Sequence, residues 1–227
     1  LPVKTRDEVG ELTRSFNSMV HQLKERSQMK AAMNLAMEVQ QNLLPRQDPQ
    51  VDGLDIAGTS IYCDETGGDY YDYIRYETGT SEGNPLAVVV GDVSGHGVPS
   101  ALLMATARAF IRQLSYLAGS IAEVVSDVNH LLTRDVEESS SFMTLFYLSV
   151  DISARRLHWV RAGHDPAIYY DPVTDRFDYL VGQGIPMGVD ADWTFEENQK
   201  DYLRPGQIIV IGTDGIWESR NAEGIMF

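Results

Sequence analysis

The sequence predicts an α+β fold that is preceded by a long N-terminal helix. Near the start, apolar residues recur with a spacing typical of a coiled coil. Further along, two helical patterns precede a series of short strand-like segments, which favours an α+β architecture over a doubly wound parallel sheet. The links between those segments are only a few residues long, whereas parallel crossovers need about a dozen or more. With 227 residues, 43% of them hydrophobic, the chain is long enough for one to two domains with a real core.

The region before Pro45 is predicted to form one long helix. Its first apolar series is spaced by four, three and four residues and comprises Leu12, Phe16, Met19 and Leu23. A second series, in a slipped phase, comprises Met29, Ala32, Ala36, Val39 and Leu43. Such a slip changes the winding of a coiled coil, so the polar stretch 24–28 either transmits a rotation or is a passive junction. Pro45 should stop the helix, because proline has no amide donor and clashes with the preceding turn.

The rest of the chain is predicted to combine strands and helices, from its apolar and β-branched runs and its helical periodicity. Strands are expected at 54–62 and 86–90, and helices at 99–117 and 121–132. A run of further strands is expected at 142–150, 157–161, 167–170, 177–180 and 207–211.

Charge and cysteine content exclude several classes of protein. The chain holds 18 Lys and Arg against 33 Asp and Glu, a net charge of −15 that is concentrated after residue 47. A nucleic-acid-binding protein needs a basic face, so we expect no nucleic-acid partner. No apolar run approaches the roughly 20 residues of a membrane span. The single cysteine, Cys63, has no internal disulfide partner and is expected to be a small buried side chain, in a soluble chain from a reducing compartment.

Three glycine-flanked aspartates stand out as candidate site residues. Asp69, Asp92 and Asp214 each follow a predicted strand, in the segments 67–72, 91–97 and 212–215. Glycine lets the backbone turn sharply and approach a ligand closely. Converging carboxylates without cysteine or a histidine cluster suit Mg²⁺ or Mn²⁺, which prefer oxygen ligands. The alternative is that each aspartate only closes a local turn through its side chain, and spacing alone leaves both possibilities open.

A set of short motifs follows residue 38 in a fixed order. They are Gln40-Gln41-Asn42-Leu43-Leu44-Pro45, Gly67-Gly68-Asp69-Tyr70-Tyr71-Asp72, Gly91-Asp92-Val93-Ser94-Gly95-His96-Gly97, Ala162-Gly163-His164-Asp165-Pro166, Gly184-Ile185-Pro186-Met187-Gly188, Leu203-Arg204-Pro205-Gly206 and Thr213-Asp214-Gly215-Ile216-Trp217-Glu218. In this order they resemble the SpoIIE/RsbU-type branch of the metal-dependent serine/threonine phosphatases.

The resemblance implies two antiparallel sheets packed face to face with helices outside, an αββα sandwich. It implies catalytic aspartates at Asp69, Asp92 and Asp214, and two Mn²⁺ or Mg²⁺ ions held by these side chains and the backbone carbonyl of Val93. Water rather than a protein side chain would attack the phosphorus. The family has a further metal-binding Asp-Asp-x-Thr motif that is not found before Phe227, so we expect a C-terminally incomplete domain.

Three other polar residues near the motifs have two interpretations each. Asp72 either orients metal-bound water or caps a turn. His96 is a candidate general acid, but its distance of four positions from Asp92 favours a role in the turn before the next helix. His164 is expected to serve turn formation and not to bind a metal.

The N-terminus carries a second resemblance. Pro2, the stretch from Asp7 to Leu12 and Phe16-Asn17-Ser18-Met19 resemble the C-terminal half of a HAMP module. The predicted domains are therefore half a HAMP module at 1–24, a coiled-coil linker at 25–47 and a SpoIIE-type phosphatase domain at 48–227. The resemblance implies a homodimer formed through the N-terminal helix. It also implies that the fragment is the cytoplasmic portion of a bacterial inner-membrane protein, with the membrane contact in segments outside it.

The predicted function is therefore that of a signalling phosphatase. The expected substrate is a phosphorylated STAS-type protein, an anti-sigma factor antagonist, with hydrolysis of phosphoserine or phosphothreonine. The alternative is a catalytically silent domain that keeps the fold as an interaction module.

Overall fold

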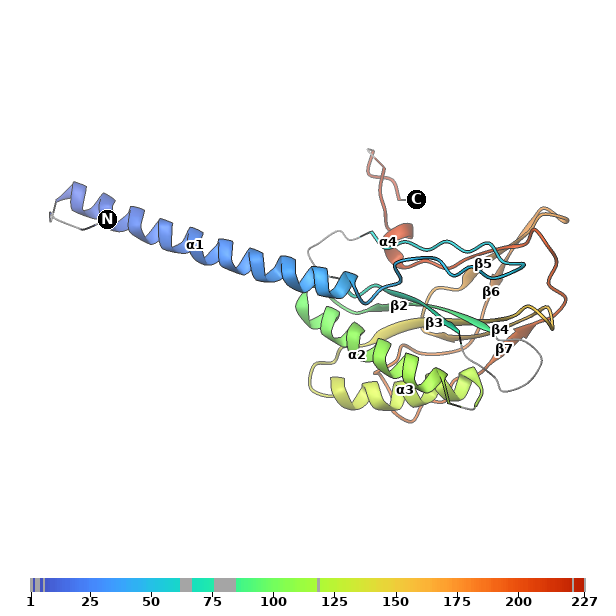
Figure 1. Ribbon diagram of the computed structural model, residues 1–227. Coiled ribbons are helices and arrows are strands. Elements are labelled where there is room, and N and C mark those ends of the chain that lie inside the picture. Colours follow the sequence, from blue (N-terminus) through green and yellow to red (C-terminus); the bar gives the residue numbers. More distant parts are fainter. Residues whose placement is uncertain are drawn as a thin grey trace.

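The computed structural model describes residues 2, 5, 7–61, 67–75, 85–117, 119–221 and 223–226. Its elements in chain order are α1 (Glu8–Gln41), β1 (Tyr70–Arg75), β2 (Leu86–Val93), α2 (Val98–Ser115), α3 (Ile121–Val136), β3 (Met143–Asp151), β4 (Arg156–Ala162), β5 (Ala167–Asp171), β6 (Arg176–Leu180), β7 (Asn198–Lys200), β8 (Ile208–Val210) and α4 (Asp214–Trp217). Figure 1 shows two sheets with α2 and α3 together on one side and α1 projecting away from them.

The helix α1 is continuous through the polar stretch at which the apolar phase slips. It begins at an N-cap, where the Asp7 carboxylate accepts a hydrogen bond from the Gly10 amide. It ends at Gln41, before Pro45. The first apolar series is exposed along it, from 45% for Phe16 to 70% for Leu12. The predicted long helix is thus confirmed, and its apolar stripe is unpaired within the described residues.

Two antiparallel sheets form the body of the protein. The larger has the strand order β1-β2-β3-β4-β7 and the smaller the order β6-β5-β8. Register in the larger sheet places Gly91 opposite Tyr70 and Asp92 opposite Thr144. Because the chain passes from β4 in one sheet to β5 in the other, the loop 163–166 lies where the sheets meet. The predicted α+β class with two antiparallel sheets and flanking helices is confirmed.

Alternating side chains of β3 divide the core into two layers. Leu145 and Tyr147 face the helices, where Met104 and Ile111 of α2 and Leu132 of α3 are fully buried. The layers therefore run from helices to the five-stranded sheet and then to the three-stranded sheet. On the other face of β3 the residues that pack between the sheets include Phe146, Leu148, Leu157, Trp159, Tyr169 and Leu180.

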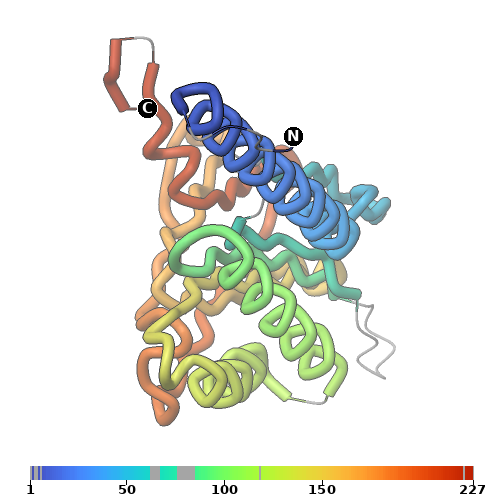
Figure 2. The backbone as a smooth tube through the Cα atoms, turned by 90° about the vertical axis from the view of Figure 1, so that its left-hand side faces the viewer, coloured from blue at the N-terminus to red at the C-terminus, as the bar shows by residue number. Residues whose placement is uncertain are grey.

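Local signals explain both flanking helices. Pro99 lies in the first turn of α2, where a missing amide costs no hydrogen bond. Ser120 and Glu123 form a reciprocal capping box at the start of α3. Both helices lie within two residues of their predicted starts and pack against each other below the sheet in the view of Figure 1. Figure 2 shows the same pair after a quarter turn, with α1 above α2, which α1 contacts.

One strand prediction is wrong, and two strands of the structure were not predicted. The described residues 54–61 form no strand, and only Leu54 makes an isolated bridge, to Val51. Within this segment Leu54 packs against the core between the sheets, whereas Ile61 is 85% exposed. Conversely, β1 and β7 were not predicted as strands. Residues 62 and 63, including Cys63, lie outside the described residues. Within the part of the chain that the structure describes, no helix has the length and hydropathy of a bilayer-spanning segment.

Candidate active site

One cavity of about 1260 Å³ between the sheets collects the three predicted aspartates. Asp92 is the penultimate residue of β2, and Asp214 is the first residue of α4, just after β8. Asp69 was predicted to follow a strand. In the structure it lies directly before β1 instead. The antiparallel pairing of β1 with β2 is what brings the start of β1 beside the end of β2. Segments far apart along the chain therefore place their carboxylates around a shared space.

The three carboxylates interact electrostatically. Burial, together with the nearby carboxylates of Asp69 and Asp214, raises the pKa of Asp92 to about 7. Burial also raises the pKa of Asp69, which the charge of Asp214 raises further, although a hydrogen bond from the Thr213 side chain opposes this. Carboxylates whose pKa values are raised by burial and by neighbouring negative charge mark a place where a cation is favoured.

Gly68 leaves space beside the backbone oxygen of Val93. A Cβ atom at position 68 would lie 2.3 Å from the Val93 carbonyl oxygen and 3.0 Å from Asp92 Oδ1. The Val93 amide donates to the Gly68 carbonyl at 3.2 Å, which holds the two segments together. Only glycine fits here, because any side chain would enter the space between these two oxygens.

These residues fit a hard divalent cation by their chemistry. Three carboxylates and a backbone carbonyl are the oxygen ligands that Mg²⁺ and Mn²⁺ prefer. Among the described residues, however, no three His, Cys, Asp or Glu side chains are already arranged closely enough to hold a metal ion by themselves. The cavity thus offers the right donors and charge without a closed side-chain cage.

The buried His164 connects the two sheets beside this cavity. Its Nδ1 atom lies 2.8 Å from the Thr144 hydroxyl oxygen, and its Nε2 atom lies 3.1 Å from the Gly212 carbonyl oxygen. Sequence reasoning assigned His164 only to turn formation and missed these contacts. The signal available was its position between Gly163 and Asp165-Pro166, which identifies a turn but says nothing of the partners of the ring.

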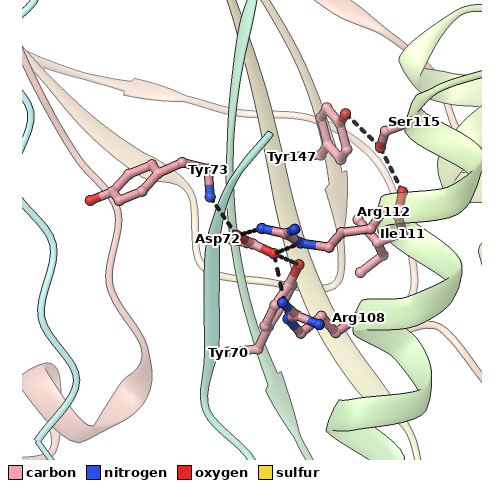
Figure 3. Close-up of polar contacts among 8 residues, drawn as sticks. All are labelled: Tyr70, Asp72, Tyr73, Arg108, Ile111, Arg112, Ser115 and Tyr147. Carbon is pink, nitrogen blue, oxygen red and sulfur yellow. Dashed lines mark hydrogen bonds and ion pairs between the residues drawn. The ribbon is translucent and has the colours of Figure 1, made fainter. Parts of the chain in front are cut away.

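Asp72 lies on the opposite face of β1 from the cavity, among basic residues of α2 (Figure 3). Arg112 grips its carboxylate with two hydrogen bonds, of 2.6 and 2.8 Å, and the Tyr70 hydroxyl donates at 3.1 Å. Arg108 approaches to 3.7 Å. Asp72 is 1% exposed. It therefore anchors α2 to β1 and is not placed to orient water at the three aspartates.

Two further contacts frame the site. His96 is exposed and lines the same cavity, in the turn before α2, as predicted for a turn residue. Gln40, in the last turn of α1, donates from its side chain to the Gly67 carbonyl at 2.5 Å. It is 4% exposed, so the end of α1 is fastened to the segment that carries Asp69. Sequence reasoning noted Gln40 only as part of a motif.

Comparison with family models gives two matches. A model described as Stage II sporulation protein E (SpoIIE) matches residues 82–227, and a HAMP domain model matches residues 1–25. The phosphoserine phosphatase RsbU of Bacillus subtilis is 27% identical over 199 residues, which cover 88% of this chain and 57% of RsbU. The chain therefore spans little more than half the length of that relative.

Solved structures with the same fold extend the likeness. The RsbU and RsbW domains of a Mycobacterium tuberculosis protein give a TM-score of 0.57 at 25% identity, covering 70% of this chain and 42% of that one. The SiaA-PP2C domain of Pseudomonas aeruginosa gives a TM-score of 0.66 at 21% identity, covering 89% and 78% respectively.

Proposed function

The chain belongs to the SpoIIE family, and from that premise we propose that it is the catalytic part of a metal-dependent protein phosphatase that removes phosphate from serine or threonine. The observation that carries the proposal is that Asp69, Asp92 and Asp214 line one cavity, where burial and the neighbouring carboxylates raise the pKa values of Asp69 and Asp92. The named activity of RsbU, phosphoserine phosphatase, supports the same reaction class.

Asp69, Asp92, Asp214 and the Val93 carbonyl would hold two Mn²⁺ or Mg²⁺ ions. Such ions supply positive charge to phosphoryl oxygens and make water a better nucleophile. The protein's own contribution is then positioning. Gly68 keeps the space beside the Val93 oxygen open, and the Thr213 side chain near Asp69 lowers the pKa of that carboxyl. Groups fixed in advance of the reaction are the main source of electrostatic catalysis.

We infer that the substrate is a phosphorylated STAS-type protein, an anti-sigma factor antagonist of a bacterial partner-switching system. The open side of the cavity supports a protein substrate, because Asp214 and His96 are exposed at its lining. A phosphoserine on a folded partner can reach the aspartates there without the cavity having to enclose a free small molecule.

We further propose that a membrane sensor controls the site through α1. The match of residues 1–25 to a HAMP domain supports this, as does the exposed apolar stripe of α1, which suits a homodimer. The contact between Gln40 and Gly67 supplies a route from α1 to Asp69. In this proposal the fragment is the cytoplasmic portion of a bacterial inner-membrane protein.

The test is phosphate release from a phosphorylated STAS-type protein in the presence of Mn²⁺ or Mg²⁺. We expect metal-dependent turnover that falls by more than about 100-fold in Asp92→Asn and in Asp214→Asn, beyond the usual cost of losing a residue that only supports a metal ligand. Asp127→Asn is the matched control, because Asp127 is exposed on α3. Turnover that is independent of metal, or equal in all variants, would contradict the proposal.

The second candidate is a catalytically silent interaction module. The lack of a ready-made three-side-chain metal site among the described residues favours it. Binding of the phosphorylated STAS-type protein without any release of phosphate, at saturating Mn²⁺, would establish that alternative.

A further inference from the structure

His164 is a buried polar side chain at the crossing between the two sheets. It is 3% exposed and lies in the loop 163–166, which leads from β4 of the larger sheet to β5 of the smaller one. Burying an imidazole is unfavourable unless both ring nitrogens find partners. The identity of those partners therefore indicates what the residue does.

The hydrogen bonds of the ring define its state. A carbonyl oxygen can only accept, so Nε2 must donate its proton to Gly212 O, 3.1 Å away. In a neutral ring Nδ1 then accepts, and the Thr144 hydroxyl at 2.8 Å is its donor. Burial lowers the pKa of His164, which is consistent with the neutral form at pH 7.

Both ends of this arrangement lead to the aspartates of the site. Thr144 is the register partner of Asp92 in the pairing of β2 with β3. Gly212 lies two residues before Asp214. The ring thus connects β3, which pairs with the strand β2 that contains Asp92, to the segment that directly precedes Asp214.

The backbone around His164 is itself fixed. Gly163 has a φ of +66°, and a Cβ atom there would lie 2.5 Å from the nitrogen of Pro186, so the tight turn requires glycine. The Arg161 side chain donates to the carbonyl oxygen of His164 and, at 3.0 Å, to that of Gly182. The direction of the imidazole is therefore imposed by its surroundings.

We propose that His164 is a positioning residue that holds the Asp214 loop against the Asp92 strand, through a bridge from the Thr144 hydroxyl across the imidazole to the Gly212 carbonyl. We call these three groups the His164 bridge. The inference rests on the metal site proposed above, but it concerns the protein before any ion binds. With both nitrogens engaged, His164 neither binds metal nor transfers a proton to substrate.

The first test is amide hydrogen exchange of the metal-free protein. We expect Thr144→Val and His164→Asn each to accelerate exchange about tenfold or more in residues 213–218, where the Ile216 and Glu218 amides are hydrogen-bonded, and to leave α3 unchanged. Thr144→Ser keeps the hydroxyl and should behave as wild type. The double variant should be no worse than either single one, because both remove the same bridge.

Exchange that is unchanged at 213–218, or that rises equally throughout both sheets, would overturn the proposal. So would additive effects in the double variant. Since this measurement involves no metal, it decides the role of the bridge even if the proposed phosphatase function fails.

The second test measures the affinity for Mn²⁺ by isothermal titration calorimetry. Thr144→Val or His164→Asn, each of which breaks the His164 bridge, should weaken the affinity for Mn²⁺ by about 10–100-fold, as mutation of other residues that orient metal ligands does. Thr144→Ser should bind as wild type, and His158→Asn serves as a control, because His158 contacts Glu197 and neither residue lines the cavity. If Asp92→Asn abolishes binding while the bridge variants bind as tightly as wild type, the positioning role is wrong and the metal site stands. If wild type itself binds no Mn²⁺, the metal site is wrong.

Discussion

Asp69 and Asp72 are three residues apart and lie on opposite faces of the larger sheet. Side chains alternate along β1, so Tyr70 and Asp72 point toward α2, whereas Tyr71 lines the cavity with Asp69. The same motif therefore serves two purposes: one carboxylate for the site, and one to attach the helix layer to the sheet that carries it.

Asp72→Asn should destabilise the protein by about 3 kcal/mol, the cost of removing one partner from a buried ion pair. The change leaves the guanidinium groups of Arg108 and Arg112 beside a neutral amide; their side chains are only 21% and 39% exposed. Urea unfolding monitored by circular dichroism measures the effect.

Asp127→Asn, an exposed change on α3, should alter the free energy of unfolding by less than about 0.5 kcal/mol. Equal unfolding midpoints for Asp72→Asn and Asp127→Asn would show that the contacts of Asp72 drawn in Figure 3 contribute no net stability.

Single residues differ in how far the sequence reveals them. Asp69, Asp92 and Asp214 are recognisable because each has glycine neighbours that serve a close approach of the backbone. His164 and Gln40 act through contacts with Gly212 and Gly67, respectively 48 and 27 positions away in the chain. No local pattern encodes such partners, since folding alone brings them together.

At the scale of elements, α1 combines an unpaired apolar stripe with a fastened end. Leu12, Phe16, Met19 and Leu23 are between 45% and 70% exposed, while Gln40 is buried against Gly67. An apolar stripe of coiled-coil spacing is typical of a helix that pairs with a second helix of the same kind.

Phe16→Glu combined with Leu23→Glu should convert the dimer that we propose into a monomer. Burial of each such side chain contributes about 1.5–3 kcal/mol, so their loss should weaken association by more than about 100-fold. Analytical ultracentrifugation over a concentration series measures the dissociation constant.

Arg14→Glu combined with His21→Glu adds the same number of acidic side chains on the opposite face of the helix. This control should dimerise as wild type. A monomeric wild-type protein across the whole series would refute pairing through the stripe.

The strands were predictable where periodicity and burial agree. The predicted strands at 86–90 and 142–150 and the three that follow correspond to β2, β3, β4, β5 and β6. The segment 54–61 shares their composition but has no neighbouring strand to pair with among the described residues, so composition alone misled. The strand β1 was missed because its tyrosines and Asp72 resemble a loop motif, although Tyr and Ile favour strands.

At the scale of the whole molecule, the site depends on two sheets that meet only through packing and a few polar contacts. Asp92 lies in the larger sheet, Asp69 directly precedes its strand β1, and Asp214 follows β8 of the smaller sheet. An ion that binds all three therefore links the sheets and should stabilise the folded state as a whole.

Mn²⁺ at about 100 times its dissociation constant should add about 2.7 kcal/mol to the free energy of unfolding, and thereby raise the melting temperature by about 5–10 °C for a chain of this size. Differential scanning calorimetry measures the shift, and a chelator should reverse it. Asp92→Asn should show no shift. An equal rise in both proteins would place the ion elsewhere.

The arrangement of the sheets was predictable from the sequence only through the ordered motifs. Composition and short links indicate antiparallel strands, but they do not say which strands share a sheet. The assignment of β5 and β6 to a separate sheet from β4 depends on the chain turning at Gly163, and that turn is defined by Pro186, which is distant in sequence.

The unbroken course of α1 has a mechanical consequence. Thirty-four residues at a rise of about 1.5 Å form a rod of about 51 Å. The helix contains no proline that would kink it, so in the control that we propose a rotation at Glu8 would be carried along the helix to Gln40 and to its contact with Gly67. A sensor that turned this rod would then act from a distance on the segment that carries Asp69.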